Sequence, residues 1–406
     1  MNQILSDRLL SFQRYITPRL LSDLGKKMVL LTGPRQVGKT TLSLQLQTRF
    51  KGAEYFNYDV LPQRAVLNAQ TWSPNSPLLI LDEIHKMPQW KGWLKGVYDG
   101  RGTANDSIAA DGIAQRILVT GSARMDTFRQ AGESLAGRFY KLRLHPISVR
   151  EWCSQTAANP EYALAHLLKR GGFPEPALAP DTAEGEQTAQ RWRKDYFQDL
   201  IREDVLEFSR IQEVNTMRVF TEMLRTRVGS PLSLASIARD MGVSPITLKK
   251  YLDILEALYI VFTVRPWHKN IARATLQQPK VYFFDTGLVQ GDEGVRFENL
   301  VACHLLRLAH WQQDSTGRNV DLHYVRTLDG AEVDFALSET DGALGGLTHL
   351  IECKWSDSKP HRALQRFAAE HPNVKATQVV RSLHTPYQVD GVEIVRAAEW
   401  LDGLEV

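Results

Sequence analysis

The stretch that decides the fold is MVLLTGPRQVGKTT, residues Met28–Thr41, in which an apolar run leads into the spacing GxxxxGKT. The apolar run predicts a buried strand, and the residues after the loop are typical of a helix N-terminus. In such a loop the glycines let backbone N–H groups wrap phosphates, the lysine reaches the β- and γ-phosphates, and the threonine hydroxyl ligates magnesium. We therefore expect a nucleotide and magnesium to contact Gly33, Pro34, Arg35, Gln36, Val37, Gly38, Lys39, Thr40 and Thr41.

Two further apolar runs supply the other half of such a site. Residues Leu78–Leu81 predict a short buried strand that delivers Asp82 and Glu83 at its carboxyl end. Asp82 is expected to hold magnesium through water, and Glu83 to polarise the attacking water. The run Ile117–Thr120 ends in GSAR, which places Ser122 where it can sense the γ-phosphate.

These motifs resemble those of AAA+ ATPases. The stretches GPRQVGKTTL, LDEIHKMPQW and ESLAGRFYKLRLHPIS together resemble one prokaryotic branch, in which the ATPase precedes a C-terminal domain of uncharacterised function. GGFPEP from Gly171, DYFQDLIREDV from Asp195 and KVYFFDTGL from Lys280 agree with that branch. The resemblance implies ATP and Mg as cofactors, ATP hydrolysis as the activity, and leaves a homo-oligomer and a protein partner open.

An arginine that stabilises charge on the γ-phosphate is usual in such sites. Arg124, directly after the third strand, and Arg138, in LAGRF, are the two candidates. Either can instead be a surface arginine, because charged side chains are mostly exposed. Arg35 lies inside the phosphate loop, where bracing the loop or contacting the ligand suits it better than acting as a finger.

The middle of the chain has the spacing of a helix-turn-helix. Leu234 and Ile237 face inward on a short helix, MGVS makes a turn, and Ser244-Pro245 is a cap followed by a favoured first helical residue. An apolar strand follows. The helix-turn-helix spacing and this strand together predict a winged helix. Residues 231–280 hold seven Lys or Arg against three acids, a patch that suits a phosphate backbone and predicts DNA binding through Lys249 and Lys250. The alternative is that this region is a packing lid and that Lys249 and Lys250 lie on a solvated helix face.

Near the C-terminus, HLIECKWSD places two opposite charges, Glu352 and Lys354, in a run that looks like a buried strand. Burying charge is costly unless it is paired or bound to metal. The preceding strand GAEVDFALS turns Asp334 to the opposite face from its apolar residues, and a hairpin brings the three together.

This order resembles the D…ExK core of restriction-endonuclease-like folds, with Glu298 as the additional helical acid. The resemblance implies that Asp334, Glu352 and Glu298 bind a divalent ion and that Lys354 acts on water and phosphate. A structural ion-pair network and a nucleic-acid grip without hydrolysis both stay open.

Composition limits the remaining possibilities. Lys plus Arg number 49 against 46 Asp plus Glu, so a polyanion partner needs a local patch. No apolar stretch is long enough to span a membrane, and Cys153, Cys303 and Cys353 are too far apart to indicate a disulfide framework or a zinc site. We expect a cytoplasmic α/β protein with a P-loop AAA+ core with a parallel sheet (1–155), a helical linker and winged-helix region (156–290) and a restriction-endonuclease-like domain (291–406).

The leading functional prediction is a DNA-associated ATPase whose nucleotide state controls a nuclease-like domain. One alternative is a nucleotide-switched DNA- or protein-binding module with no nuclease activity. The other is a signalling ATPase with no nucleic-acid contact.

Overall fold

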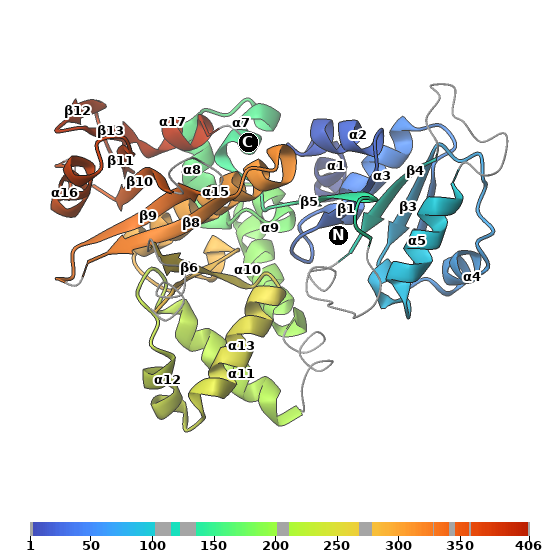
Figure 1. Cartoon of the computed structure of the whole chain (residues 1–406), viewed down its shortest axis with the longest axis horizontal. Coiled ribbons are helices and arrows are strands. Elements are labelled where there is room, and N and C mark those ends of the chain that lie inside the picture. The colour runs from blue at the N-terminus through green and yellow to red at the C-terminus, as the bar shows by residue number, and fades with distance from the viewer. Residues whose placement is uncertain are drawn as a thin grey trace. The chain divides into compact units, whose positions relative to one another are not determined.

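The computed structural model describes residues 3–101, 115–121, 135–200, 211–267, 278–327, 329–340, 346–356 and 359–404 (Figure 1). The chain divides into two compact units, Met1–His145 and Pro146–Val406. In the described parts of the chain, no helix has the length and apolar character needed to cross a membrane.

The first unit is built on a five-stranded sheet in the order β2-β3-β4-β1-β5, and every pair of neighbours is parallel. The parallel sheet predicted from the apolar runs is confirmed. Because parallel strands end at the same edge, the loop after β1 lies beside the ends of β3 and β4. The elements are α1 (Gln3–Ser11), α2 (Thr17–Leu24), β1 (Met28–Thr32), α3 (Lys39–Arg49), β2 (Glu54–Asn57), α4 (Leu61–Ala69), β3 (Leu78–Asp82), η1 (Ile84–Lys86), α5 (Trp90–Gly100), β4 (Arg116–Thr120) and β5 (Phe139–Arg143).

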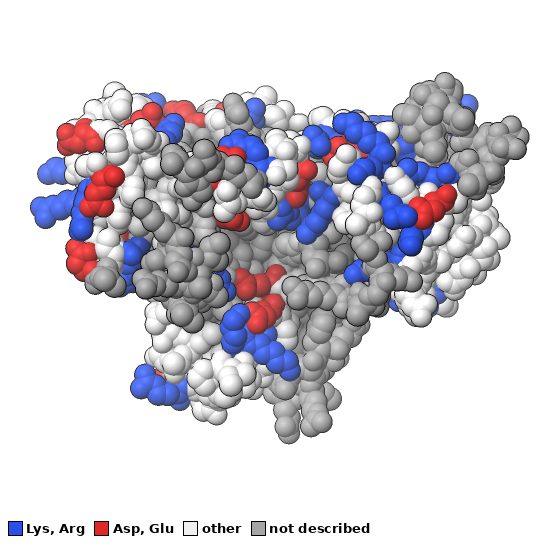
Figure 2. Space-filling view, viewed as in Figure 1, with Lys and Arg blue, Asp and Glu red and all other residues white. Residues whose placement is uncertain are grey.

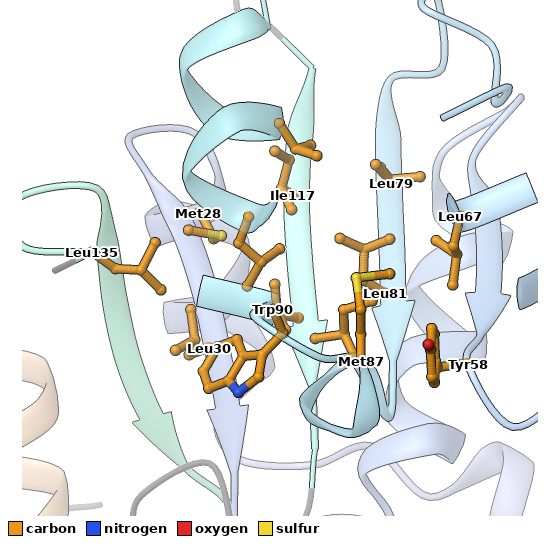
Figure 3. Close-up of a cluster of buried hydrophobic side chains, with 14 residues drawn as sticks. Met28, Leu30, Tyr58, Leu67, Leu79, Leu81, Met87, Trp90, Ile117 and Leu135 are labelled. Atoms are coloured by element: carbon orange, nitrogen blue, oxygen red, sulfur yellow. The ribbon is translucent and has the colours of Figure 1, made fainter. Parts of the chain in front are cut away.

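One face of this sheet packs against α4 and α5. Alternate residues of the central strands, among them Leu30, Leu81 and Val119, lie in one buried cluster with Trp90 of α5 and Leu67 of α4 (Figure 3). Side chains of a strand alternate between its two faces, so the intervening residues lie on the face toward α2 and α3. Burial on both faces explains why these strands read as continuous apolar runs.

The second unit contains an eight-stranded mixed sheet in the order β12-β13-β11-β10-β9-β8-β6-β7. Its helices include α15, which packs on β7, β8 and β10, and α16, which packs on β9, β10 and β11. The elements are α7 (Val149–Thr156), α8 (Pro160–Arg170), α9 (Pro174–Leu178), α10 (Ala183–Asp199), α11 (Ile211–Arg225), α12 (Leu234–Met241), α13 (Pro245–Ala257), β6 (Val261–Pro266), β7 (Lys280–Phe283), η3 (Thr286–Leu288), α15 (Glu293–Thr316), β8 (Val320–Arg326), β9 (Glu332–Glu339), β10 (Gly346–Lys354), α16 (Arg362–Glu370), β11 (Lys375–Val380), β12 (Tyr387–Val389), β13 (Val392–Arg396) and α17 (Ala397–Asp402).

The helix pair α12–α13 has the cap at Ser244 that the sequence predicts, whereas Met241 of the predicted turn is the last residue of α12. The side chains of Ser233 and Ser244 cap the two helices, and Pro245 is the first residue of α13. The strand that follows, β6, pairs antiparallel with β7 and parallel with β8. The expected wing strand thus belongs to the edge of the large sheet, whose other strands come from the C-terminal part of the chain.

The predicted hairpin near the C-terminus is formed by β9 and β10. These strands are antiparallel, with Phe335 opposite Ile351 and Ala336 opposite Leu350. The hairpin places Asp334 beside Glu352, because the Asp334 backbone N–H donates to Glu352 Oε2 at 3.2 Å.

Candidate functional site

The loop between β1 and α3 folds around the side chain of Lys39. Its Nζ donates to the carbonyl oxygens of Gly33 and Pro34, at 2.9 and 2.6 Å, and the side chain is buried. A Cβ at Gly33 would lie 2.4 Å from the carbonyl oxygen of Leu144, and φ there is +142°, so only glycine fits. The ammonium group is therefore held at the N-terminus of α3, where phosphate oxygens are favoured.

Arg14 braces this loop from outside the motif. Its guanidinium donates to the carbonyl oxygens of Val37 and His145, both at 2.6 Å, and the side chain is 6% exposed. Within the loop, Arg35 is half-buried and Gln36 is exposed with φ 57°. Arg14 was not predicted from the sequence, because it is a single arginine outside any motif and no neighbouring residue indicates that it supports the loop.

Asp82 is the most firmly held acid of the first unit's site. Its carboxylate accepts the Thr40 hydroxyl at 2.9 Å and the Tyr55 hydroxyl at 2.6 Å on one oxygen, and the Thr120 hydroxyl on the other. Burial and the Asp82 carboxylate raise the pKa of Tyr55, so the phenol stays a donor. A threonine hydroxyl beside a carboxylate supplies the oxygen ligands that magnesium prefers. Thr40 and Asp82 thus fit the ion predicted for them, and Tyr55 is a support that the sequence did not reveal.

Glu83 follows β3 in a left-handed conformation, with φ 55°. Its backbone N–H donates to Asp82 Oδ1 at 3.1 Å. Burial raises the pKa of Glu83; Lys86, 3.5 Å away, lowers it, and Asp82 raises it further. A half-buried carboxylate with a raised pKa beside a phosphate loop is suited to accept a proton from water. Positive φ in a non-glycine residue is common at functional sites.

The other residues predicted for this site are Arg138, Ser122 and Arg124. Arg138 donates from Nε and Nη2 to the two carboxylate oxygens of Asp99, at 2.8 and 3.0 Å. Its role as an arginine finger stays a prediction. Ser122 and Arg124 lie outside the described residues.

A second polar cluster lies in the C-terminal unit around Lys280, the first residue of β7. Lys280 Nζ lies 2.7 Å from Glu332 Oε1, 3.5 Å from Asp334 Oδ1 and 3.6 Å from Glu298 Oε1, and the side chain is 1% exposed. Burial alone would lower the pKa of Lys280, but the three carboxylates outweigh it and raise the pKa. The basic patch predicted over residues 231–280 includes Lys280. That assignment is wrong, because the ammonium is buried among acids.

Glu352 and Lys354, at the carboxyl end of β10, belong to the same cluster. Glu352 Oε1 accepts from Lys354 Nζ at 2.7 Å, and Asp334 Oδ2 accepts from the backbone N–H of Cys353 at 2.9 Å. Burial and Asp334 raise the pKa of Glu352 to about 8, and they raise that of Glu298 to about 7. The structure thus brings together all four residues that the sequence singled out, together with Lys280 and Glu332, which it did not.

A divalent ion does not fit this cluster as it stands. The ammonium of Lys280 lies within 3.6 Å of the carboxylates of both Asp334 and Glu298, where an ion shared by these acids would be held. In the described part of the chain, no three acidic, histidine or cysteine side chains are arranged to hold a metal ion. The metal-binding roles of Asp334, Glu352 and Glu298 stay predictions, and this arrangement does not favour them.

The predicted DNA-binding lysines lie on the exposed side of α13. Lys249 forms an ion pair with Asp253 one turn later, and Lys250 is exposed. In the region of α11 and α13, Figure 2 shows basic side chains with acidic side chains beside them. The surface there carries mixed charge, which is weaker support for phosphate binding than the count of basic residues indicated.

Three family models match successive parts of the chain. Residues 25–153 match the model of an AAA domain, which with the phosphate loop and the parallel sheet supports a P-loop AAA-type ATPase domain. Residues 161–295 and 293–400 match models of two domains of unknown function, DUF8612 and DUF4143.

Relatives with similar sequences occur in distant bacteria. An uncharacterized protein of Mycobacterium tuberculosis is 32% identical over 266 residues, which are 64% of this chain and 55% of that protein. The chain thus spans about half the length of this relative and of its counterpart in Mycobacterium bovis. An uncharacterized protein of Haemophilus influenzae is 22% identical over 402 residues, with 91% of this chain and 93% of that protein covered.

Similar solved structures include the Orc1 protein of Aeropyrum pernix in complex with DNA. It is 14% identical, with a TM-score of 0.35, over 74% of this chain and 95% of that one. A Walker-type ATPase of Pyrococcus abyssi is 13% identical, with a TM-score of 0.38, over 70% of this chain and 95% of that one. Similarity of this degree does not indicate a function, so the function of this chain is inferred from its own residues.

Proposed function

We propose that this chain hydrolyses ATP with magnesium and associates with DNA. The observation that carries the proposal is the hydrogen bond from the Thr40 hydroxyl to the Asp82 carboxylate. Thr40 follows the loop that holds Lys39, and Asp82 directly precedes Glu83. The residues proposed to bind phosphate, ion and water thereby follow the carboxyl ends of β1 and β3, which lie on either side of β4. A structural loop would need neither a buried lysine nor a carboxylate aligned by three hydroxyl groups.

Each residue of the site has a separate task in this proposal. Backbone N–H groups of the loop and the ammonium of Lys39 would bind the β- and γ-phosphates, and Thr40 with Asp82 would hold magnesium. Magnesium supplies neutralisation of charge on the phosphate oxygens. Glu83 would accept a proton from the attacking water, for which its raised pKa makes it a stronger base.

Two substitutions separate binding from turnover. Lys39→Ala removes a charge-assisted hydrogen bond to phosphate, so nucleotide affinity should fall by roughly 10- to 100-fold. Glu83→Gln keeps the shape but removes the base, so ATP should still bind while turnover falls by about 10²- to 10⁴-fold. Titration with a fluorescent ATP analogue and release of phosphate measure the two effects.

The matched control for Lys39→Ala is Lys51→Ala, which removes an exposed lysine of the same unit. It should change neither quantity. Undiminished nucleotide affinity in Lys39→Ala would refute the phosphate site, and wild-type turnover in Glu83→Gln would refute the assignment of the base.

DNA association is supported by the helix pair α12–α13, whose second helix exposes Lys249 and Lys250. A helix pair with this spacing can present its second helix to a DNA groove, and lysines contact phosphates as point charges. The pairing of Lys249 with Asp253 means that the lysine must exchange one anionic partner for another.

DNA cleavage is a second candidate function for the C-terminal cluster. It is favoured by the gathering of Asp334, Glu352 and Lys354 at the ends of β9 and β10, and opposed by the position of Lys280. Incubation with single-stranded, double-stranded and branched DNA in magnesium or manganese tests it. Cleavage that Lys354→Ala abolishes would support the candidate, and intact DNA in every case would eliminate it.

A further inference from the structure

A groove in the second unit lies between α10 and α11, with η3 as its floor. Its volume is about 770 Å³, within the range of ligand sites. The residues that line it from α10 recur at the spacing of one helix face, and so do those from α11. Five of the lining side chains are cationic and one is acidic: Arg193, Lys194, Arg218, Arg225 and Arg227, against Glu222.

Two of these arginines are fixed to the floor of the groove. Arg193 Nε lies 3.2 Å from the carboxylate of Asp285, which is 1% exposed, and Arg225 Nε donates to the carbonyl oxygen of Leu288 at 2.6 Å. A Cβ at Gly287 would lie 2.0 Å from Arg193 Nε, so glycine is required for the guanidinium to lie this close. Arg225 also pairs with Glu222 through Nη1 at 2.8 Å, so Asp285 and Glu222 offset two of the five cations and the groove keeps an excess of positive charge.

Parts of three stretches that carry the resemblance of this chain to other sequences lie in or beside this groove. KVYFFDTGL contributes Asp285 and Gly287, and DYFQDLIREDV contributes Phe197 and Gln198 of α10 to the wall. GGFPEP contributes Gly171, where a Cβ would lie 2.0 Å from Asp285 Oδ1.

The walls of the groove combine charge with apolar surface. Lys194 and Arg218 are exposed on opposite walls. Between the cations lie Met223 and Val219, and the side chain of Val219 is 48% exposed. Cations with an apolar surface suit a ligand that has both phosphates and bases to stack, whereas a polyanion without bases would leave that surface in water.

We propose that this groove binds an unpaired strand of nucleic acid, with phosphates on the cations and a base against the apolar wall. The inference rests on the proposed DNA association and adds a surface distinct from the α12–α13 helix pair. A duplex keeps its bases stacked between its two strands and has none to offer to a groove of this size.

The test uses the full chain and a fluorescein-labelled oligothymidylate, with binding followed by anisotropy over a range of salt concentrations. The variant is Lys194→Glu with Arg218→Glu, both at exposed positions. Its affinity should fall by about tenfold or more, and the salt slope should decrease by about 1.4, since each phosphate contact on a single strand contributes about 0.7. The matched control is Arg191→Glu, which reverses an exposed charge of α10 outside the groove and should bind as wild type.

The possible outcomes separate this inference from the function it rests on. Equal affinity and slope in variant and wild type overturn the groove, and leave DNA association standing if the wild type binds. Displacement of the oligonucleotide by poly-glutamate at matched charge also overturns it, in favour of an acidic peptide. A wild-type chain that binds no nucleic acid overturns the groove and DNA association together, while ATP turnover in the same preparation shows whether the ATPase proposal survives.

Discussion

Replacement of the buried lysine tests the account of the acidic cluster most directly. Lys280→Met keeps most of the side-chain volume but removes the ammonium that contacts Glu298, Glu332 and Asp334. Removing one partner of a buried ion pair costs about 3–5 kcal/mol, because the remaining charges are stranded. At about 2–4 °C per kcal/mol, the melting temperature of the second unit should fall by about 6–20 °C.

The pH dependence of this loss has a definite sign. Burial and Asp334 raise the pKa of Glu298 to about 7, so this carboxyl takes up a proton as the pH falls below that value. A protonated carboxyl no longer needs a cation beside it. The destabilisation in Lys280→Met should therefore be largest at about pH 8 and should shrink toward about pH 5.5.

Thermal unfolding of the full chain, followed by circular dichroism at the two pH values, measures the effect. The matched control is Lys375→Met, which makes the same change at a strand residue that is 51% exposed and paired with Glu393 on the surface. Exposed ion pairs contribute about 0–1 kcal/mol, so this variant should melt close to wild type. Equal melting temperatures for the two variants, or a loss that grows as the pH falls, would refute the reasoning.

Two further predictions concern the second unit. Glu298→Gln should stabilise the protein by up to about 3 kcal/mol at about pH 8 and should have little effect at about pH 4. The folded pKa of Glu298 is raised from 4.5 to about 7, so its carboxyl destabilises the wild-type protein increasingly as the pH rises through that range. Urea titrations at both pH values decide it, and a variant less stable than wild type at about pH 8 contradicts it. Lys249→Glu with Lys250→Glu should weaken binding to unrelated duplexes alike and reduce the salt slope by about 2. An unchanged slope would favour the helix pair as a packing element.

The residues of the proposed nucleotide site were predictable because their information is local. Gly33, Lys39 and Thr40 lie within one short motif, and its spacing indicates which atoms would face a phosphate. Asp82 and Glu83 follow from a second local rule, the acidic end of a buried strand. Tyr55 and Arg14 support this site through single side chains on segments without a motif, so only the fold reveals them.

The C-terminal cluster was predictable only in part, for a different reason. Period-two alternation placed Asp334 and Glu352 correctly on their strands, because a hairpin between neighbouring strands follows from the chain order. Lys280 reaches the same cluster by way of β7, at the far edge of the sheet. The pairing of β6 with β8 depends on long-range register, which local periodicity does not encode. A lysine heading a wholly apolar strand was the one signal that could have found it.

The pairing of β6 and β7 with the large sheet limits which fragments of the chain can be studied alone. During synthesis this hairpin is complete before Val320–Arg326 exists, and until then β6 presents an unpaired edge. Unpaired edges invite association with other chains. A fragment ended near residue 290 would keep that edge open for good and would bury Lys280 without Glu298, Glu332 or Asp334. Such a fragment should aggregate, so the helix pair is best studied by substitution within the full chain.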